Sequence, residues 1–228
     1  MAQPIVQIRE DAVASRLHVL PQSRQLRALH SIVRSRNATR GDFVHHSNRI
    51  IRQLLDAAID LLPHEAASVE TPVGATYEGL RLTHRLTGVS VIRAGESMEG
   101  ELRALYPAIG IGKILIQRDK TTKLPKLFYH NLPADIAEGH VLLLDPMLAT
   151  GGTALEAINV LAEQGVPESR IILVTFIAAP EGVARVNDVR PEVTIVTSSL
   201  EQRLNENAYM IPGIGDFGDR YFGTDLKP

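Results

Sequence analysis

The spacing of apolar residues divides the chain into a helical first part and an alternating strand and helix remainder. A first stripe at the spacing of one helix face consists of Leu26, Leu29, Ile32 and Val33. A longer amphipathic stripe covers residues 50–62 and ends at Pro63. Short aliphatic and β-branched runs then predict strands at residues 89–92, 113–116, 141–144, 171–177 and 193–197. A helix is expected over residues 152–163, before Gly165 and Pro167.

Strands that alternate with helices predict an α/β fold, with a parallel sheet covered by helices on both faces. The polar segment that begins at residue 118 and resumes as a short strand breaks this rhythm, so residues 118–133 are expected to form a projecting β-hairpin. No linker-like stretch divides the chain. We therefore expect one domain over residues 1–228, in which residues 1–24 are an uninformative N-terminal extension.

Composition narrows the class of protein without identifying it. A chain of 228 residues with 44% hydrophobic and 22% charged content can bury a sizeable core. Its net charge of -2 argues against binding to nucleic acid or membrane by bulk electrostatics. Cysteine is absent, which excludes a disulfide framework and a thiolate nucleophile. The N-terminus has no basic start followed by an apolar run, so we expect a cytoplasmic protein.

One segment carries the chemistry of a phosphate-binding site. The apolar run 141–144 leads into Asp145, which would lie at the carboxyl edge of the sheet, where open α/β proteins bind ligands. The residues that follow are Pro146, Met147, Leu148, Ala149, Thr150, Gly151, Gly152 and Thr153. Small side chains from 149 to 153 leave backbone N–H groups free to approach phosphate oxygens at a helix start. Asp145 could then reach the hydroxyls of an attached ribose.

The segment from Asp145 to Thr153 resembles the signature of the phosphoribosyltransferases, in the form found in uracil phosphoribosyltransferases. In that family an acidic residue and a T-G-G-[ST] loop bind phosphoribosyl pyrophosphate (PRPP). The resemblance implies the type I phosphoribosyltransferase fold and assigns PRPP binding to residues 145–153. Leu144 stands where many members carry a second acid, which implies weaker protein control over the metal. No metal ligands are assigned, and Mg²⁺ is expected to arrive with PRPP.

Two arginines extend the resemblance. Arg93, in the turn Arg93-Ala-Gly95, matches a turn that binds the pyrophosphate side of the donor. A structural ion pair is the alternative for this residue. Arg118, at the base of the predicted hairpin, matches a catalytic arginine that contacts the pyrophosphate when the hairpin closes as a flap. Without the resemblance, the hairpin would be read as a solvated charged loop.

Near the C-terminus, Gly213 to Gly218 formally match a dinucleotide-binding fingerprint. We reject this match, because Pro212 and the chain end leave no room for the strand, the crossover helix and the acid about twenty positions later that the fingerprint requires. This glycine-rich string instead resembles the uracil-binding segment of the same family. The resemblance assigns Met210, Gly215, Asp216 and Phe217 to uracil, and gives Asp216 a catalytic place beside PRPP and its metal. A phenylalanine at position 217 is typical of the eukaryotic branch.

Arg40 and Arg49 match residues that bind GTP as an activator at a subunit interface in some eukaryotic members. Ordinary surface arginines are the alternative. The family also implies a homodimer or homotetramer.

The implied function is transfer of the phosphoribosyl group of PRPP to uracil, which yields UMP and pyrophosphate in pyrimidine salvage. No covalent nucleophile is needed, and the isolated His130 and His140 lie in no site motif. Three alternatives remain open at this point. They are a phosphoribosyltransferase for another base, a regulator that binds PRPP or nucleotides with little turnover, and a catalytically silent subunit.

Overall fold

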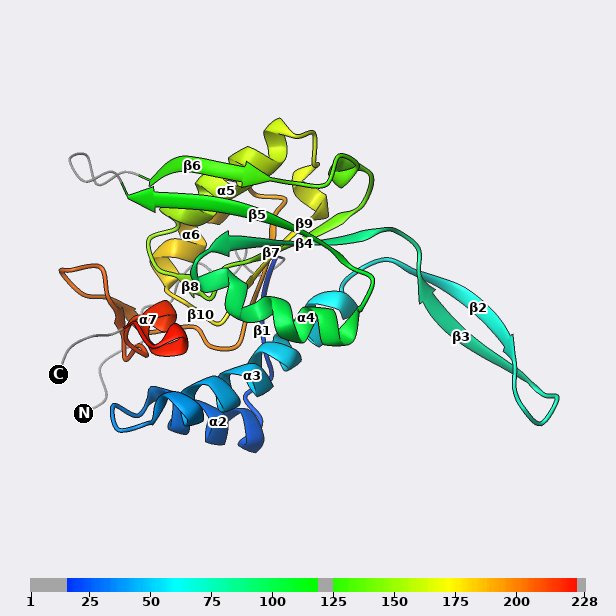
Figure 1. Cartoon of the computed structure of the whole chain (residues 1–228), viewed down its shortest axis with the longest axis horizontal. Coiled ribbons are helices and arrows are strands. Elements are labelled where there is room, and N and C mark those ends of the chain that lie inside the picture. Colours follow the sequence, from blue (N-terminus) through cyan, green and yellow to red (C-terminus); the bar gives the residue numbers. More distant parts are fainter. Residues whose placement is uncertain (1–15, 119–124, 225–228) are drawn as a thin grey trace.

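The protein is described by a computed structural model that covers residues 16–118 and 125–224. Its centre is a seven-stranded sheet in the order β1-β11-β9-β7-β4-β5-β6 (Figure 1). The strands are β1 (Leu17–Val19), β4 (Leu86–Ile92), β5 (Gly110–Arg118), β6 (Pro125–Asn131), β7 (His140–Leu144), β9 (Ile171–Thr175) and β11 (Thr194–Thr197). Every neighbouring pair is parallel except β5 and β6, which confirms the predicted fold class.

Helices cover both faces of this sheet. The helices are α2 (Arg24–Arg34), α3 (Arg40–Asp60), α4 (Glu99–Leu105), α5 (Gly152–Glu163), α6 (Pro180–Val189) and α7 (Phe217–Phe222). Alternate residues of β7 point to opposite faces: Leu142 and Leu144 join a core with α2, α3 and α4, whereas Val141 and Leu143 join a core with α5 and α6. All four side chains are fully buried. This accounts for the continuous apolar run, because a strand covered on both faces has no polar side.

The two early helices follow the predicted stripes with small differences. Ser23 caps α2 and Thr39 caps α3, each by accepting a hydrogen bond from a backbone N–H of the first turn. The expected place of Ile32 in the buried stripe is wrong, since Ile32 is 37% exposed and His30 is buried in that face. The second stripe is buried, but α3 ends at Asp60, before Leu62.

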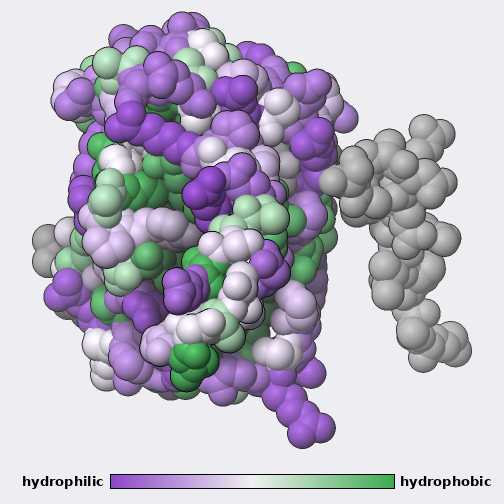
Figure 2. Space-filling model, turned by 90° about the vertical axis from the view of Figure 1, so that its right-hand side faces the viewer, coloured by the Kyte–Doolittle hydropathy of each residue, from purple (hydrophilic) through white to green (hydrophobic). Residues whose placement is uncertain are grey.

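A second hairpin was not predicted. Strands β2 (His64–Glu70) and β3 (Thr76–Leu82) pair antiparallel and form a separate two-stranded arm that extends away from the sheet (Figure 1). Most of its side chains on both faces lie in solvent, so the sequence lacks the alternation that marks a half-buried strand. Its exposed apolar residues are Val69, Val73, Tyr77 and Leu80. Figure 2 faces this side of the molecule and shows hydrophobic side chains at the surface among hydrophilic ones.

The predicted hairpin at residues 118–133 corresponds to the paired strands β5 and β6. The last partner of β4 on β5 is Leu115, and residues 116–118 continue beyond it, paired with β6 alone. Residues 119–124, the tip of this hairpin, lie outside the described residues. The antiparallel pair confirms the hairpin, and its role as a flap stays a prediction.

Short elements complete the fold. They are β8 (Met147–Leu148), β10 (Ile177–Ala178), β12 (Arg203–Leu204), β13 (Met210–Ile211), and the 3₁₀ helices η1 (Ala94–Met98), η2 (Ile136–Glu138) and η3 (Glu168–Arg170). Strand β8 pairs with β10, and β12 pairs with β13. Within the described part of the chain, none of the helices has the length and hydropathy needed to cross a membrane.

Candidate active site

The predicted phosphate-binding segment, which we call the donor loop (residues 145–153), leaves the carboxyl end of β7. Backbone hydrogen bonds hold its start in place, because the Asp145 N–H donates to Val174 O at 3.2 Å and Pro146 O accepts from the Phe176 N–H at 3.0 Å. The pairing of β8 with β10 then fixes Met147 and Leu148. The first half of the donor loop is therefore held by backbone pairing with the segment that follows β9, and its β8 forms a separate two-stranded sheet with β10.

The second half of the donor loop is a tight turn into α5. Gly151 has a φ of 78°, which favours glycine, and α5 begins at the next residue. Gly182 of α6 lies so close that a Cβ there would be 2.4 Å from Ala149 O. Residues 147–154 line a small cavity of about 40 Å³. Since this cavity opens at a helix N-terminus and residues 149–154 of its walls are small, it suits an anion such as a phosphate.

Asp145 is the acidic residue of the donor loop, and its environment disfavours its charge. Burial raises the pKa of Asp145 to about 7, although the hydrogen bond from the Met147 N–H, at 3.4 Å, acts in the opposite direction. The residue as a whole is only partly buried. A carboxylate with this pKa, partly open to solvent at a sheet edge, is suited to accept hydrogen bonds from a bound ligand's hydroxyls.

The turn that begins at Arg93 lies directly beside the donor loop. A Cβ on Gly95 would be 2.2 Å from Leu144 O, so only glycine allows η1 to pack against the end of β7. Arg93 forms an ion pair with Asp219 of α7 at 2.6 Å and donates a second hydrogen bond to Thr224 at 2.7 Å. The ion pair joins the predicted pyrophosphate turn to the C-terminal helix, as the structural alternative for Arg93 expects. The contact of Arg93 with pyrophosphate stays a prediction.

The predicted catalytic arginine, Arg118, is placed only through its backbone. Arg118 is the last residue of β5. Its side chain is outside the description, so its contact with pyrophosphate stays a prediction.

The predicted uracil-binding segment, which we call the base turn (residues 210–217), faces the donor loop across a second cavity. This cavity has a volume of about 280 Å³. Met147 and Ala149 of the donor loop line one part of it, and Met210, Gly213 and Gly215 line another. A volume just below the roughly 300–1,000 Å³ of pockets for drug-sized ligands suits a small heterocycle. The fold thus brings two segments together that lie some sixty positions apart in the sequence.

Phe217 supports the base turn from the core side. Its side chain is fully buried and lies edge-on to Phe43, with ring centroids 5.2 Å apart, and stacked with Tyr221 at 5.7 Å. The preceding residue, Asp216, is exposed and caps α7 by accepting a hydrogen bond from the Asp219 N–H at 2.8 Å. The aromatic ring anchors the turn, and the Asp216 carboxylate is exposed, but neither Asp216 nor Phe217 is among the residues that line the cavity.

The two arginines predicted to bind GTP are not brought together within one chain. Arg40 lines a cavity of about 240 Å³ next to α7, where its Nε donates to Tyr221 O at 3.0 Å. Arg49 is exposed nine residues further along α3. Nine residues rotate an α-helix by about two and a half turns, which places these two side chains on opposite sides of α3.

His130 and His140 are also separated from this cavity. His130 is exposed on the edge strand β6, and His140 begins β7 at the edge opposite the donor loop. Burial, followed by the nearby His84 and Arg170, lowers the pKa of His140. Neither histidine lines the cavity between the donor loop and the base turn.

Sequence reasoning missed the side chains that support the base turn from behind. Glu201 is buried and paired with Arg34, and Arg220 donates to backbone carbonyls of the same region. No local pattern marks these residues, because Arg34 and Glu201 are 167 positions apart.

The comparisons with known proteins identify the family of the chain. The family model for uracil phosphoribosyltransferase matches residues 19–224. A uracil phosphoribosyltransferase from Dictyostelium discoideum is 50% identical over 91% of this chain and 96% of that protein. The one from Saccharomyces cerevisiae is 49% identical over 90% of this chain and 95% of that protein. These eukaryotic relatives confirm the predicted branch.

The chain also resembles proteins with other names. It is 49% identical to Uridine kinase-like protein 4 of Arabidopsis thaliana, of which it spans only 44%. Among solved structures, the AQ2163 protein from Aquifex aeolicus has a TM-score of 0.81 and 27% identity over 92% of this chain and 100% of that one. With a family model that matches nearly the whole described length, the chain belongs to the uracil phosphoribosyltransferase family.

Proposed function

We propose that this protein transfers the phosphoribosyl group of PRPP to uracil and releases UMP and pyrophosphate. The observation that carries the proposal is the 280 Å³ cavity, whose walls come from the donor loop and the base turn. A sugar phosphate held by the first segment and a planar base held by the second would meet inside it. Family membership agrees with this assignment.

Each segment has a role that follows from its chemistry. Backbone N–H groups of residues 149–153 bind the 5′-phosphate at the start of α5. Asp145 orients the ribose hydroxyls. Arg93 and Arg118 balance the charge of the pyrophosphate, because a guanidinium group offers paired donors to phosphate oxygens. For Arg93 this requires exchange of Asp219 for the pyrophosphate as its partner.

The base turn recognises uracil mainly through its backbone. Uracil presents two carbonyl acceptors and one N–H besides its reacting nitrogen, and a turn with glycines offers both N–H and C=O groups. Gly215 and Met210 line the cavity, where Gly215 offers backbone groups and Met210 forms part of the apolar wall. The predicted contact of Phe217 with uracil would require movement of the turn, because the residue is fully buried. Asp216 is exposed beside this turn, and its proposed place is next to the reacting base and the donor.

The reaction is a substitution at the anomeric carbon. A bond forms between uracil N1 and ribose C1, and the bond from C1 to the pyrophosphate oxygen breaks, with its electron pair leaving on pyrophosphate. The N1 proton passes to water. The residues contribute positioning and charge stabilisation rather than a covalent intermediate. Asp145 and Asp216 provide carboxylate oxygens of the kind that suits Mg²⁺ carried on substrate phosphates. The bound Mg²⁺ would supply neutralisation of the leaving pyrophosphate.

The decisive test offers PRPP with uracil, cytosine, orotate, adenine and hypoxanthine separately. Formation of UMP from uracil alone is expected. Turnover of a different base would replace uracil in the proposal, and PRPP binding without turnover of any base would favour the regulator. Absence of both turnover and PRPP binding would favour the silent subunit. The variant Gly182→Ala tests the donor loop, because the added Cβ would lie 2.4 Å from Ala149 O and displace the loop there. It should reduce turnover of whichever base is used.

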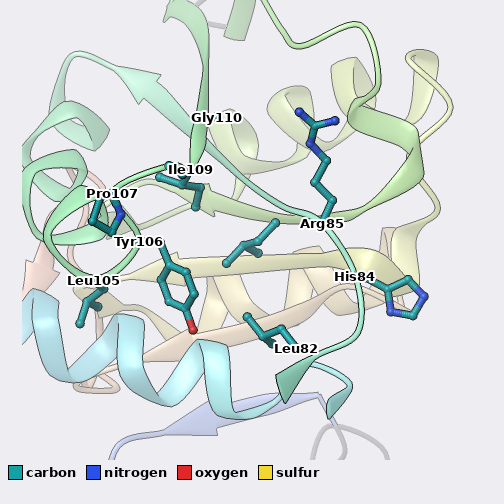
Figure 3. Close-up of a pocket in the computed structure, with 10 residues that line it drawn as sticks. Leu82, His84, Arg85, Leu105, Tyr106, Pro107, Ile109 and Gly110 are labelled. Carbon is teal, nitrogen blue, oxygen red and sulfur yellow. The ribbon is translucent and has the colours of Figure 1, made fainter. Parts of the chain in front are cut away.

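For partners, we propose that the arm formed by β2 and β3 joins copies of the chain into a homodimer or homotetramer. Its exposed apolar side chains, among them Val73 at 88% exposure and Leu80 at 72%, are costly to leave in water. An apolar cavity of about 350 Å³ lies at the base of the arm, lined by leucines and Tyr106 (Figure 3). His84 and Arg85 point away from these leucines. Val73→Asp should lower the mass measured by analytical ultracentrifugation, and an unchanged mass would exclude the arm as the interface.

GTP is proposed as an effector through Arg40 and Arg49, which can act together only if two chains contribute, because they lie on opposite sides of α3. Addition of millimolar GTP should change turnover or oligomeric state, and Arg40→Ala should remove the effect. If neither property responds, the effector role is wrong. A cytoplasmic location is likewise proposed, and cell fractionation tests it.

A further inference from the structure

The base turn rests on a buried ion pair that does not line the cavity. Glu201 has a side chain that is 1% exposed and lies between β10 and β12, where its backbone N–H donates to Ala178 O at 2.7 Å. Arg34, in the last turn of α2, approaches it at 2.6 Å. One partner of the pair is thus anchored on the sheet and the other on a helix that packs on α3.

This pair holds both polar backbone groups of Gly213. The Gly213 N–H donates to Glu201 Oε2 at 2.8 Å, and Arg34 Nη1 donates to Gly213 O at 3.1 Å. The neighbouring carbonyl, Ile214 O, accepts from Arg220 Nη1 at 2.6 Å. Side chains, rather than strand or helix partners, therefore satisfy the buried peptide groups at the centre of the base turn.

The carboxylate of Glu201 is saturated with donors. Oε1 accepts from Arg34 Nη2 at 2.6 Å and from Ser199 Oγ at 3.1 Å. Oε2 accepts from Arg34 Nη1 at 2.9 Å as well as from Gly213. Burial alone would raise the pKa of Glu201, but the hydrogen bonds from Arg34 and Gly213 outweigh it, so that the pKa is lowered. The charged, fully bonded form is the stable one.

The backbone of the turn cannot hold this shape by itself. Gly213 has a φ of 69°, and a Cβ at this position would be 2.3 Å from Met210 O, so the chain folds back on itself here without a regular ladder. Gly213 and Met210 line the cavity opposite Met147 and Ala149. A shift of Gly213 would therefore change the width of the space in which a base would lie.

We propose that Glu201 and Arg34 are positioning residues for the base, which set the distance between the base turn and the donor loop and so determine how tightly a pyrimidine ring is held. This inference rests on the proposed function for the identity of the ligand. Neither residue is catalytic, since neither lines the cavity. Their effect on the reaction passes through the peptide groups of Gly213.

The test compares Glu201→Gln with the parent enzyme. Glutamine keeps the shape of the side chain, but its NH₂ group replaces an oxygen that accepts two hydrogen bonds, either from Arg34 and Ser199 or from Arg34 and Gly213. At least the bond from Arg34 on that side is therefore lost. The KM for uracil should rise about tenfold, whereas the KM for PRPP and kcat should stay within about twofold of the parent values. Arg34→Lys, which keeps the charge but loses the paired geometry, should raise the KM for uracil in the same direction.

The ion pair between Glu168 and Arg190, at 2.6 Å, offers a control. The Arg190 side chain is about as buried as that of Arg34, and the pair does not line the cavity between the donor loop and the base turn. Glu168→Gln should leave both KM values unchanged. Equal rises of both KM values in Glu201→Gln, or a change in kcat alone, would overturn the positioning role, because they indicate a general loss of structure.

Hydrogen exchange separates this inference from the proposed function. The Gly213 amide should exchange at least about tenfold faster in Glu201→Gln than in the parent, whichever base the enzyme uses. Accelerated exchange in an enzyme that uses another base would overturn uracil as the substrate and support the positioning role. The KM for the base that is used should then rise in place of the KM for uracil. Unchanged exchange would overturn the positioning role even if uracil is the substrate. If Glu201→Gln does not fold, Arg34→Lys carries the same measurements.

Discussion

Replacement of Asp145 by asparagine should make the protein more stable and the enzyme worse. Burial raises the pKa of this carboxyl from 3.8 to about 7, so at neutral pH the folded protein holds a charge in an unfavourable place. The substitution removes that charge and keeps the size and the acceptor oxygen of the side chain. The hydrogen bond from the Met147 N–H can therefore survive.

The size of the effect follows from linkage. A rise of about three pKa units corresponds to roughly 4 kcal/mol, and the partial solvent access of the residue reduces the expected gain to about 2 kcal/mol. Because the folded pKa is raised, the stability associated with the protonated carboxyl is fully present below the unfolded pKa and is lost as the pH rises through about 7. The difference between variant and parent should thus be close to zero near pH 4 and reach its full value above pH 7.

The assay is urea denaturation of both proteins over this pH range, together with steady-state kinetics at neutral pH. The KM for PRPP should rise by about tenfold or more in Asp145→Asn, since an uncharged amide is a weaker partner for ribose hydroxyls. Asp188→Asn, at an exposed position of α6, serves as the control and should change neither property. A variant less stable than the parent at neutral pH, or a difference in stability that does not depend on pH, would refute this account of Asp145.

Three further changes have defined outcomes. Gly95→Ala places a methyl group 2.2 Å from Leu144 O and should lower the free energy of unfolding by about 2–4 kcal/mol, as measured by urea denaturation. Gly182→Ala should push Ala149 outward and raise the KM for PRPP more than the KM for uracil, as measured by steady-state kinetics. Burial lowers the pKa of His30 from 6.5, its value in the unfolded chain, to about 4 in the folded protein. The protein therefore loses stability as the pH falls from 6.5 to about 4. His30→Gln should therefore reduce that acid-induced loss by about 3 kcal/mol in denaturation at a series of pH values.

Controls for these changes lie in the same chain. Gly100 has no atom within 4 Å of an added Cβ, so Gly100→Ala in α4 should be neutral or slightly stabilising. An equal loss of stability at both glycines would contradict the close approach at Gly95. Acid sensitivity that persists in His30→Gln would mean that another group is responsible for it.

The sequence by itself determined the alternating architecture and the position of the donor loop. The run 141–144 is apolar at every position because β7 is covered on both faces, and such a strand leaves an unmistakable pattern. The bounds of α5, at Gly152 and Glu163, were likewise predictable, because glycines and a proline flank a strong helix former. Local signals of this kind survive in the sequence because they depend on neighbours along the chain.

Only the tertiary structure decided the rest. The arm of β2 and β3 was invisible because its faces lie in solvent and need no apolar alternation. Arg93 contacts Asp219, and Arg34 contacts Gly213, although each pair is more than a hundred positions apart in the sequence. Glu201 supports the same glycine from only twelve positions away. Such contacts arise from the crossing of strands and helices in space, which the order of residues along the chain does not display.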